Sequence, residues 1–515
     1  MIRILLLVTL GFLMAQSKAY GQSNRVLNAY TSDLLQQSIE LAEKAWDAQT
    51  MLLRRPLGSD AGHAQIYMVR ESSWYALGLL ERDAPGDRQR AVGIIDAVLK
   101  QQYTTPGVRW YGTFRRSPEE PMPSTSAKMW SGYDPNWREF IGTTFAVILI
   151  EFPGRVPNQL AQRMETAIEC AIQGEIDEKR LRPTYSNIAL MYGFLWDYAA
   201  VHGHRAPWRQ AADQWCEQVY RRYKQYGAFD EYNSPTYYGV DLYGLALWRS
   251  YGSTQSMHTK GQEMEAGLWR SIATFYSPAL RNLSGPFDRT YGMDMQSYVS
   301  LLGVWLSTVQ APGQAPLPAI ALDTDHVADF WFIPHIAILG ARIPDDAMRK
   351  LEQLSGEHLQ RSQITEKRTA TAWIGKDLIY GGEITQKTKA TEPENQFSPA
   401  TIQWRTPSGK IGWMRVVESP AIDAVADKEG LSIAANGALR IRLFAAGLRA
   451  EDIRASSWEL PGLRVKVKCD AKSFKTEPAG AALDLVYEGM TAMRLKIEKV
   501  AISANASPQV AVITQ

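Results

Sequence analysis

The spacing of apolar residues changes once along the chain, and this change constrains the fold more than any other feature. From about residue 30 to about 350 the apolar residues recur at helical spacing, whereas beyond about 365 they alternate along the chain and are punctuated by Gly and Pro. Residues 401–418, TIQWRTPSGKIGWMRVVE, are typical of the second part, with Pro-Ser-Gly predicted as a hairpin turn. A chain of 515 residues has room for two large domains. We therefore predict a helical domain followed by a β domain, joined between residues 350 and 370.

The N-terminus has the features of a secretory signal. Arg3 precedes an apolar run over residues 4–15, and residues 19–21 (AYG) have small side chains at the −3 and −1 positions of a cleavage site. The run is shorter than the ~20 apolar residues that cross a bilayer, and no later stretch reaches that length. We expect residues 1–21 to be a signal peptide, and the mature protein to be periplasmic or secreted without a membrane span.

Charge and motifs argue against several classes of function. The chain has 56 Lys plus Arg and 54 Asp plus Glu, so its net charge of +2 provides no field that attracts nucleic acid. No P-loop, GxGxxG or GxSxG motif supports nucleotide binding or a serine hydrolase. The three cysteines lack the CxxC spacing of a thiolate zinc site, and His202 and His204 are interpreted as loop packing. We predict neither a metal nor a cofactor.

Polar or aromatic clusters precede the apolar helices at regular intervals. These helices are expected to begin near Ser73, Trp137, Asn187, Tyr237 and Gly292, at intervals close to 50 or 60 residues. Such a period fits helical hairpins that stack into a solenoid or close into an (α/α) toroid, although ordinary packing with coincidental spacing gives the same pattern. In a ring, the loops leading into the inner helices open at one mouth. Clusters far apart in the sequence would then converge there.

Two of these clusters contain an asparagine at a predicted helix start. In residues 133–152 (YDPNWREFIGTTFAVILIEF), Asn136 and Trp137 are either a helix cap and a core side chain or groups at the mouth of a cleft, where Trp stacks on a sugar. In residues 185–196 (YSNIALMYGFLW), Asn187 either caps the next inner helix or directs its amide into the cavity.

Two further clusters hold tyrosines and charged side chains. Residues 226–248 (YGAFDEYNSPTYYGVDLYGLALW) contain a turn at Ser-Pro and several candidate polar groups. The alternative is that the tyrosines of this cluster only fill the core. Residues 284–295 (SGPFDRTYGMDM) contain Asp288 and Arg289, which are either site residues or partners in a surface salt bridge. The candidates in the first of these clusters are Asp230, Glu231, Tyr232, Asn233, Tyr237, Tyr238 and Tyr243.

Taken together, the clusters resemble the toroid domains of polysaccharide lyases. The segment NWREFIG resembles the Asn-Trp-Trp…Ile-Gly segment of the chondroitin AC and hyaluronate lyase group. The segment EYNSPTYY resembles the Glu-x-Ser-Pro-x-Tyr-His segment of the heparinase II/III and alginate lyase group. The resemblance implies an (α/α) toroid catalytic domain over residues 22–355 and an antiparallel β-sandwich domain over residues 365–515, of which FSPATIQW (397–404) resembles the opening strands.

The resemblance also implies roles for individual residues in β-elimination. Tyr237 would be the catalytic base and acid, Asn187 would neutralise the substrate carboxylate, and Arg289 would lower the pKa of the tyrosine. The histidine that follows this tyrosine in the heparinase group is Tyr238 here, and a register through YYGVDLYG makes Tyr243 the base instead. The expected substrate-binding residues are Asn136, Trp137, Glu231, Tyr232 and Tyr238.

The sequence therefore predicts an exported polysaccharide lyase whose partner is an anionic polysaccharide or oligosaccharide. One alternative is a toroid glycoside hydrolase that uses two carboxylates from Asp230, Glu231, Asp241 and Asp288. Another is a non-catalytic protein whose aromatic side chains bind a glycan without cleaving it. The near-neutral charge argues mildly against a heavily sulfated substrate.

Overall fold

The chain folds into two units, which are described separately. The computed structural model describes residues 27–56, 66–203, 205–393 and 395–500, so the predicted signal peptide lies outside the described residues. We call Met1–Glu231, Pro235–Trp269 and Met295–Pro344 the helical unit. We call Tyr232–Ser234, Arg270–Asp294 and Asp345–Gln515 the β unit. Each unit is thus assembled from segments that are separate in the sequence.

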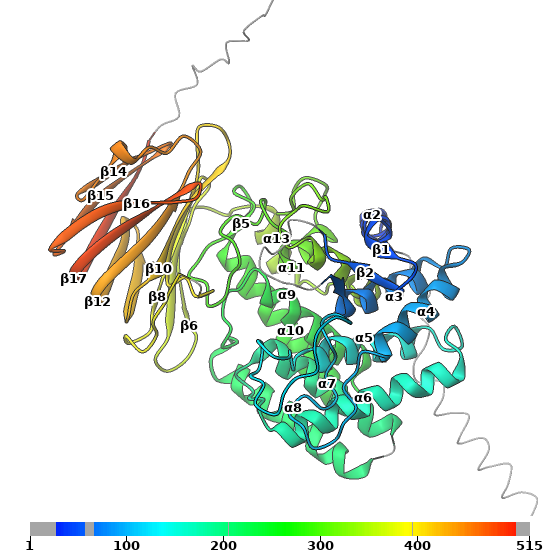
Figure 1. The fold of residues 1–515 in the computed structure, drawn as a ribbon. Helices are drawn as coiled ribbons and strands as arrows, with labels where there is room; N and C mark the ends of the chain where they lie inside the picture. The colour runs from blue at the N-terminus through cyan, green and yellow to red at the C-terminus, as the bar shows by residue number, and fades with distance from the viewer. Residues whose placement is uncertain (1–26, 57–65, 204, 394, 501–515) are drawn as a thin grey trace, which may run out of the picture. The chain divides into compact units, whose positions relative to one another are not determined.

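Long helices joined by loops form most of the helical unit (Figure 1). The helices of the described chain are α2 (Ala29–Ala45), α3 (Val69–Arg82), α4 (Asp87–Leu99), α5 (Trp137–Glu151), α6 (Asn158–Glu178), α7 (Ser186–His202), α8 (Ala206–Tyr226), α9 (Tyr237–Tyr251), α10 (Gln255–Phe275), α11 (Leu301–Ser307), η1 (Val327–Phe332), α12 (Ile333–Leu339), α13 (Asp345–Glu352) and η2 (Ala450–Asp452). Short strands β1 (Trp46–Asp47), β2 (Leu52–Arg54) and β3 (Tyr67–Met68) pair antiparallel beside them.

The helices of this unit form two concentric layers. The hairpins α3–α4, α5–α6 and α7–α8 pack internally, and α3, α5, α7 and α9 contact one another in that order. Helix α12 contacts both α9 and α3, which closes the inner layer into a ring. Helices α4, α6 and α8 lie outside it. The helical unit is therefore an (α/α) toroid, as the sequence predicted.

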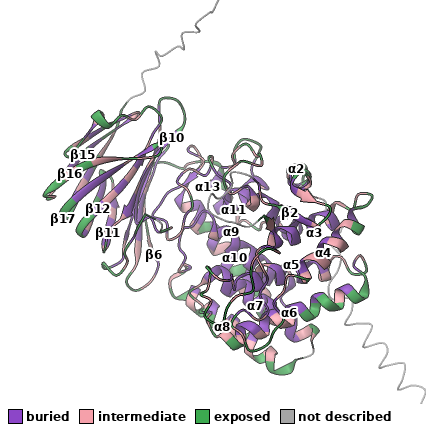
Figure 2. Cartoon of the chain, in the orientation of Figure 1, coloured by how far each residue is buried: buried purple, intermediate pink, exposed green. Residues whose placement is uncertain are grey.

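The composition of each helix explains its layer. The inner helix α7 is apolar around its circumference and is buried along nearly its whole length, whereas the outer helix α6 buries one stripe (Figure 2). That stripe contains Leu160, Met164, Ala167, Ile168 and Ala171 at helical spacing. The opposite face of α6 is polar and exposed, so α6 cannot exchange places with α7 without burying charge.

The predicted helix starts agree with the structure in four cases and fail in one. Helices α3, α5, α7 and α9 begin close to the predicted positions, but no helix begins near Gly292. Helix α11 begins at Leu301, where the Ser300 hydroxyl accepts a hydrogen bond from the Gly303 N–H. The prediction was wrong because residues 287–290 instead form backbone hydrogen bonds with residues 396–398 of the β unit.

The β unit is antiparallel throughout its described strands. These are β4 (Tyr276–Ser277), β5 (Asn282–Leu283), β6 (His358–Gln363), β7 (Thr369–Ile374), β8 (Leu378–Ile384), β9 (Ala400–Arg405), β10 (Ile411–Glu418), β11 (Ile422–Asp427), β12 (Gly430–Phe444), β13 (Ile453–Arg454), β14 (Ser457–Leu460), β15 (Leu463–Cys469), β16 (Ser473–Ala479) and β17 (Ala482–Lys499). The hairpin predicted over residues 401–418 is confirmed by the pairing of β9 with β10.

Two long strands fold the large sheet into a sandwich. The first half of β12 pairs with β11 and its second half pairs with β10, while β17 pairs with β16 and then with β15. The register between β12 and β17 shifts at Gly437, whose φ of 95° suits glycine at a bend. Strand β11 packs against β7 and β8 without pairing with them, so the sheet covers itself in two layers. This confirms the predicted antiparallel β-sandwich.

Candidate active site

The starts of three inner helices define the candidate site. Trp137 is the first residue of α5, Asn187 the second of α7 and Tyr237 the first of α9. Because an outer helix returns the chain between each pair of inner helices, these starts lie at the same end of the ring. We call this end the mouth. It brings together, within the helical unit, the clusters that the sequence places 50 residues apart.

Asn187 and Glu231 bond to each other at the mouth. The Nδ2 atom of Asn187 donates to Oε2 of Glu231 over 2.6 Å, and the Ser186 hydroxyl donates to the same oxygen over 3.3 Å. Asn187 is only 1% exposed and Glu231 only 6%. A carboxylate at a helix N-terminus is favourable, so Glu231 holds the start of α7 and fixes the Asn187 amide.

Asn136 does not cap its own helix. Its Nδ2 atom donates to the Tyr185 hydroxyl over 2.8 Å, and its Oδ1 atom accepts from Nη1 of Arg180 over 2.9 Å. Trp137 is 7% exposed, and the guanidinium of Arg70 lies 5.5 Å from its ring centre. In this structure both side chains support the mouth, and Trp137 is packed against Arg70 rather than open to a sugar.

The four candidate tyrosines differ in exposure. Tyr237 is partly exposed, whereas Tyr238 is 1% and Tyr243 is 0% exposed. The ring of Tyr243 lies edge-on to Phe332, at 4.8 Å between ring centres, and burial raises the pKa of Tyr243 well above its usual value. Tyr232 belongs to the β unit, and burial raises its pKa to about 12. Of the four, Tyr237 is therefore best suited to meet a substrate.

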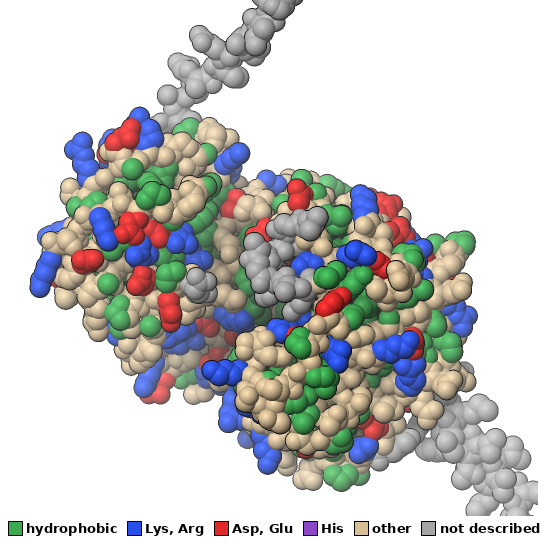
Figure 3. Space-filling model, viewed as in Figure 1, with side chains coloured by type: hydrophobic (Ala, Val, Ile, Leu, Met, Phe, Trp, Pro, Cys, Tyr) green, Lys and Arg blue, Asp and Glu red, His purple; other side chains and the backbone are tan. Residues whose placement is uncertain are grey.

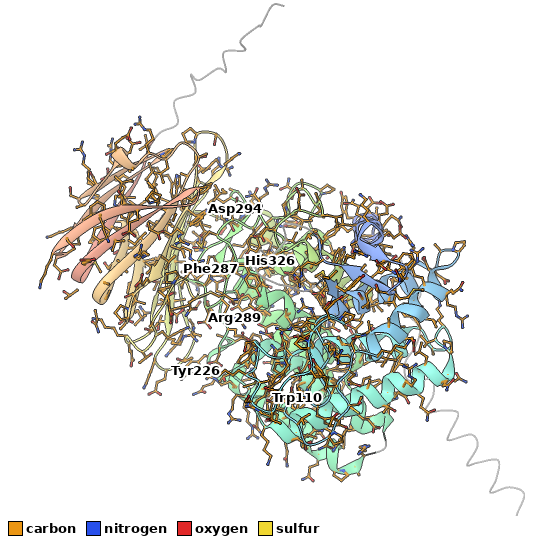
Figure 4. All side chains as sticks on the ribbon, in the orientation of Figure 1. Trp110, Tyr226, Phe287, Arg289, Asp294 and His326 are labelled. Carbon is orange, nitrogen blue, oxygen red and sulfur yellow. The ribbon has the colours of Figure 1, made fainter. Side chains whose placement is uncertain are left out.

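Arg289 belongs to the β unit, on the loop segment after β5 that also carries Phe287 and Asp294 (Figure 4). Its Nε atom donates to the side-chain oxygen of Gln396 over 2.9 Å, and it is partly buried. Asn233, also in the β unit, donates from Nδ2 to the carbonyl oxygens of Ser284 and Pro286, at 2.6 and 2.8 Å. The influence of Arg289 on the Tyr237 pKa stays a prediction.

A buried ionic network beside the mouth was missed from the sequence. The Arg138 side chain is 0% exposed and pairs with Glu175 and Glu178, each at 2.8 Å. Arg180 pairs with the same Glu175 at 2.7 Å and also holds Asn136. Burial, and then the charge of Glu175, raise the pKa of Glu139 well above its usual value. The segment GEIDEKR looks like a solvated helix end, so its sequence carries no signal of burial.

The carboxylates of the hydrolase alternative are engaged elsewhere or enclosed. Asp230 forms a two-pronged ion pair with Arg222, at 2.5 and 2.9 Å. Asp241 is 0% exposed, and Glu231 is hydrogen-bonded to Asn187. Asp288, in the β unit, pairs with Arg368 at 2.9 Å and with Lys389. No two of these groups form an open pair within either unit.

The sequence interpreted His202 and His204 as loop packing. His202 stacks on Tyr198 at 4.1 Å, while His204 lies outside the described residues. Among the described residues no group of three or more His, Cys, Asp or Glu side chains is arranged to hold a metal, and no helix is long and apolar enough to cross a membrane. Lys and Arg side chains are interspersed with Asp and Glu on the visible face of each unit (Figure 3).

Two family models match the chain. Residues 32–341, more than half of the sequence, match the family described as Domain of unknown function (DUF8769). The chain belongs to this family. Residues 356–489 match a second one, described as Domain of unknown function (DUF8770). A search of curated proteins found no match.

Solved structures similar to this chain include two lyases and an endoglucanase. Heparinase III has a TM-score of 0.45 at 8% identity, covering 95% of this chain and 87% of its own. Streptomyces coelicolor A3 chondroitin AC lyase, in complex with chondroitin sulphate, has a TM-score of 0.43 at 9% identity, covering 93% of this chain and 80% of its own. Endoglucanase CelQ from Clostridium thermocellum has a TM-score of 0.30 at 10% identity, covering 92% of this chain and 93% of its own.

Proposed function

We propose that this protein is an exported polysaccharide lyase that cleaves a 4-linked, uronate-containing glycan by β-elimination. The observation that carries the proposal is the position of Tyr237, which is partly exposed at the start of α9 and at the same mouth as Asn187. The motifs around both residues are those that resemble the toroid lyases. The proposed partner is an anionic polysaccharide or oligosaccharide, met in the periplasm or outside the cell after removal of residues 1–21.

The reaction needs a base on one atom of the uronate and an acid on another. The base takes the C5 proton, the electrons of the C5–H bond form the C4=C5 double bond, and the C4–O4 bond breaks with protonation of O4. Tyr237 as phenolate accepts the C5 proton and as phenol returns a proton to the departing oxygen. A phenol titrates near 10 in water, so the reaction near neutral pH needs a cation that lowers the pKa of the tyrosine.

Asn187 has the chemistry to stabilise the charge that develops on the uronate. Its amide carries two N–H donors, and Glu231 accepts one of them at 2.6 Å. In the proposed complex the second N–H donates to the substrate carboxylate, where negative charge accumulates as the C5 proton leaves. Glu231 is then a positioning residue that holds the amide at the mouth.

The experiment follows ultraviolet absorbance, because elimination leaves an unsaturated uronate and hydrolysis does not. The mature protein is mixed with alginate, glucuronan, hyaluronan, chondroitin, heparosan and pectic polymers. We expect absorbance to rise with one class of polymer. Tyr237→Phe should lower the rate on the order of 100-fold, since it removes the proton-transfer group. Tyr243→Phe should leave it within a few fold, because the Tyr243 hydroxyl is enclosed in the ring.

Other outcomes separate the alternatives. New reducing ends without a rise in absorbance would show hydrolysis and refute the lyase proposal. Binding without cleavage of any polymer would show a glycan-binding protein. A rate that falls in Tyr243→Phe and not in Tyr237→Phe would establish the second register, in which Tyr243 is the base.

A further inference from the structure

A concave site lies on the helical unit, between α6, α7 and α8. It is a pocket of about 240 Å³. None of its lining residues was predicted as a site residue from the sequence. They are Glu175, Ile176, Lys179, Leu181, Arg182, Tyr192, Trp196 and Trp215. We call it the α7 pocket.

Three aromatic side chains form one side of the α7 pocket. The ring of Tyr192 lies 4.9 Å from that of Trp196, at an interplanar angle of 33°, and 5.1 Å from that of Trp215, at 81°. The indole N–H of Trp215 donates to the Ala189 carbonyl over 2.9 Å, which fixes this ring against α7. Both tryptophans are partly exposed. Fixed indoles of this kind provide an apolar surface for stacking at small entropic cost.

Buried polar atoms of the lining residues complement this surface. Glu175 is 3% exposed, and its Oε1 atom accepts from Arg138 and Arg180, whereas its Oε2 atom has no hydrogen-bond partner among the described residues. The buried Nε1–H of Trp196 likewise has no acceptor in the described part of the chain. Buried polar groups without a hydrogen-bond partner are unfavourable. Each of these atoms has the chemistry to bond with a hydroxyl, which both donates and accepts.

The rim of the α7 pocket is cationic. Lys179 and Arg182 are exposed, and neither pairs with an acidic side chain among the described residues. Arg182 instead turns its guanidinium to the carbonyl oxygens of Lys179 and Leu181, at 3.3 and 3.1 Å. Arg138 and Arg180 already compensate the charge of Glu175. The pocket therefore favours an anionic ligand over an ammonium group.

We propose that the α7 pocket binds one anionic sugar unit of a glycan chain, apart from the unit that is cleaved. The sugar ring stacks on Trp196 and Trp215, a hydroxyl bonds with Glu175, and the carboxylate or sulfate meets Lys179 and Arg182. A volume of about 240 Å³ lies below the ~300–1,000 Å³ of pockets for drug-sized ligands, which suits a single ring. This inference rests on the proposed function in one respect, which is that the ligand is a glycan.

One side chain connects the pocket with the mouth. Arg180 binds Glu175 at 2.7 Å, and its other terminal nitrogen binds Asn136 at 2.9 Å. Glu175, which lines the pocket, and Asn136, which precedes α5, therefore share a single guanidinium. In the proposed complex, a polymer bound at the mouth extends to the pocket, and a short oligosaccharide does not.

The test measures binding and cleavage separately. Affinity electrophoresis in gels containing alginate, hyaluronan, chondroitin or heparosan gives the dissociation constant in the Tyr237→Phe background, which does not depend on turnover. One of these polymers is expected to bind the protein and slow its migration. We expect Trp196→Ala and Arg182→Glu each to weaken binding of that polymer about tenfold, or ~1.4 kcal/mol. The matched control is Trp208→Ala, which removes a tryptophan of α8 that does not line the pocket. In the active protein the same changes should raise KM for polymer and leave kcat on a tetrasaccharide unchanged.

Two results would overturn the proposal. Binding in both variants equal to that of Trp208→Ala would show that the pocket does not contact the glycan. A KM that rises equally for polymer and tetrasaccharide would show an effect on the mouth instead. Because Arg182 is exposed on a loop, Arg182→Glu tests the pocket even if Trp196→Ala fails to fold. Retained binding that depends on the pocket, with no absorbance on any polymer, would refute the lyase and leave this inference standing.

Discussion

At the scale of single residues, the candidate site depends on which side chains bond to each other. Asn187 and Glu231 were both predicted as site residues, but the sequence carried no indication that they form a hydrogen bond, because they lie 44 positions apart. Trp137 was predicted either as a core side chain or as a group at a cleft mouth, and in the structure it lies against Arg70. Which partner a side chain contacts follows from how it is buried, and its burial depends on neighbours that are distant in the sequence.

His335 provides a prediction on pH and stability. It is 0% exposed, its Nε2 atom lies 3.0 Å from the Thr144 hydroxyl, and burial lowers its pKa to about 3. In the unfolded chain it titrates near 6.5. The unfolded chain therefore binds a proton between pH 6.5 and 3 that the folded protein does not, so this contribution to stability is complete above pH 6.5 and falls as the pH decreases.

Urea unfolding at several pH values measures this effect. Between pH 6 and 4 the free energy of unfolding of the native protein should fall more steeply than that of His335→Gln, by up to about 1.4 kcal/mol per pH unit. His202→Gln, which replaces an exposed histidine, should keep the native slope. Equal slopes in the native protein and His335→Gln would contradict the assignment.

At the scale of elements, the period of the apolar residues located the inner helices but not their closest contacts. Inner helices approach each other at glycines. A Cβ atom added to Gly244 of α9 would lie 2.6 Å from the Leu190 Cβ of α7, closer than any normal contact. A Cβ atom added to Gly93 of the outer helix α4 would have the Met51 sulfur as its nearest neighbour, at 3.4 Å, which is an ordinary contact distance.

Two glycine substitutions test this packing. Gly244→Ala should lower the free energy of unfolding by about 1–3 kcal/mol, because α7 and α9 must separate to admit the methyl group. Gly93→Ala should be neutral or stabilising by up to about 1 kcal/mol, because alanine favours the helix and finds space. Calorimetric unfolding compares both with the native protein. A Gly244→Ala protein as stable as Gly93→Ala would refute the close approach of the two helices.

At the scale of the whole molecule, the β unit includes a segment that the sequence assigned to the helical part. Residues 270–294 belong to this unit, and Phe287 forms a backbone bridge with Ser398. The buried side chain of Gln403 donates from Nε2 to the carbonyl oxygens of Leu283 and Met293, at 3.1 and 2.8 Å. The sandwich is therefore completed by residues that precede it by about a hundred positions.

A fragment of residues 345–515 should consequently fail to fold. Without residues 270–294 the Gln403 amide and the backbone of Ser398 lose buried partners, each at a cost of about 1–3 kcal/mol. Near-ultraviolet circular dichroism and urea unfolding should show no cooperative transition in the fragment, and one in the intact protein. A cooperative transition in the fragment would show that the segment is dispensable.

The sequence by itself determined the helical and β parts, the toroid with four of its inner helix starts, and the β9–β10 hairpin. These follow from local periodicity, since one helix face or strand face repeats within a few residues. Only the tertiary structure decided that Tyr237 is partly exposed and Tyr243 enclosed, that Glu231 holds Asn187, and that residues 270–294 join the β unit. Exposure and partner choice arise where distant segments meet, and a local pattern carries no information about which segments those are.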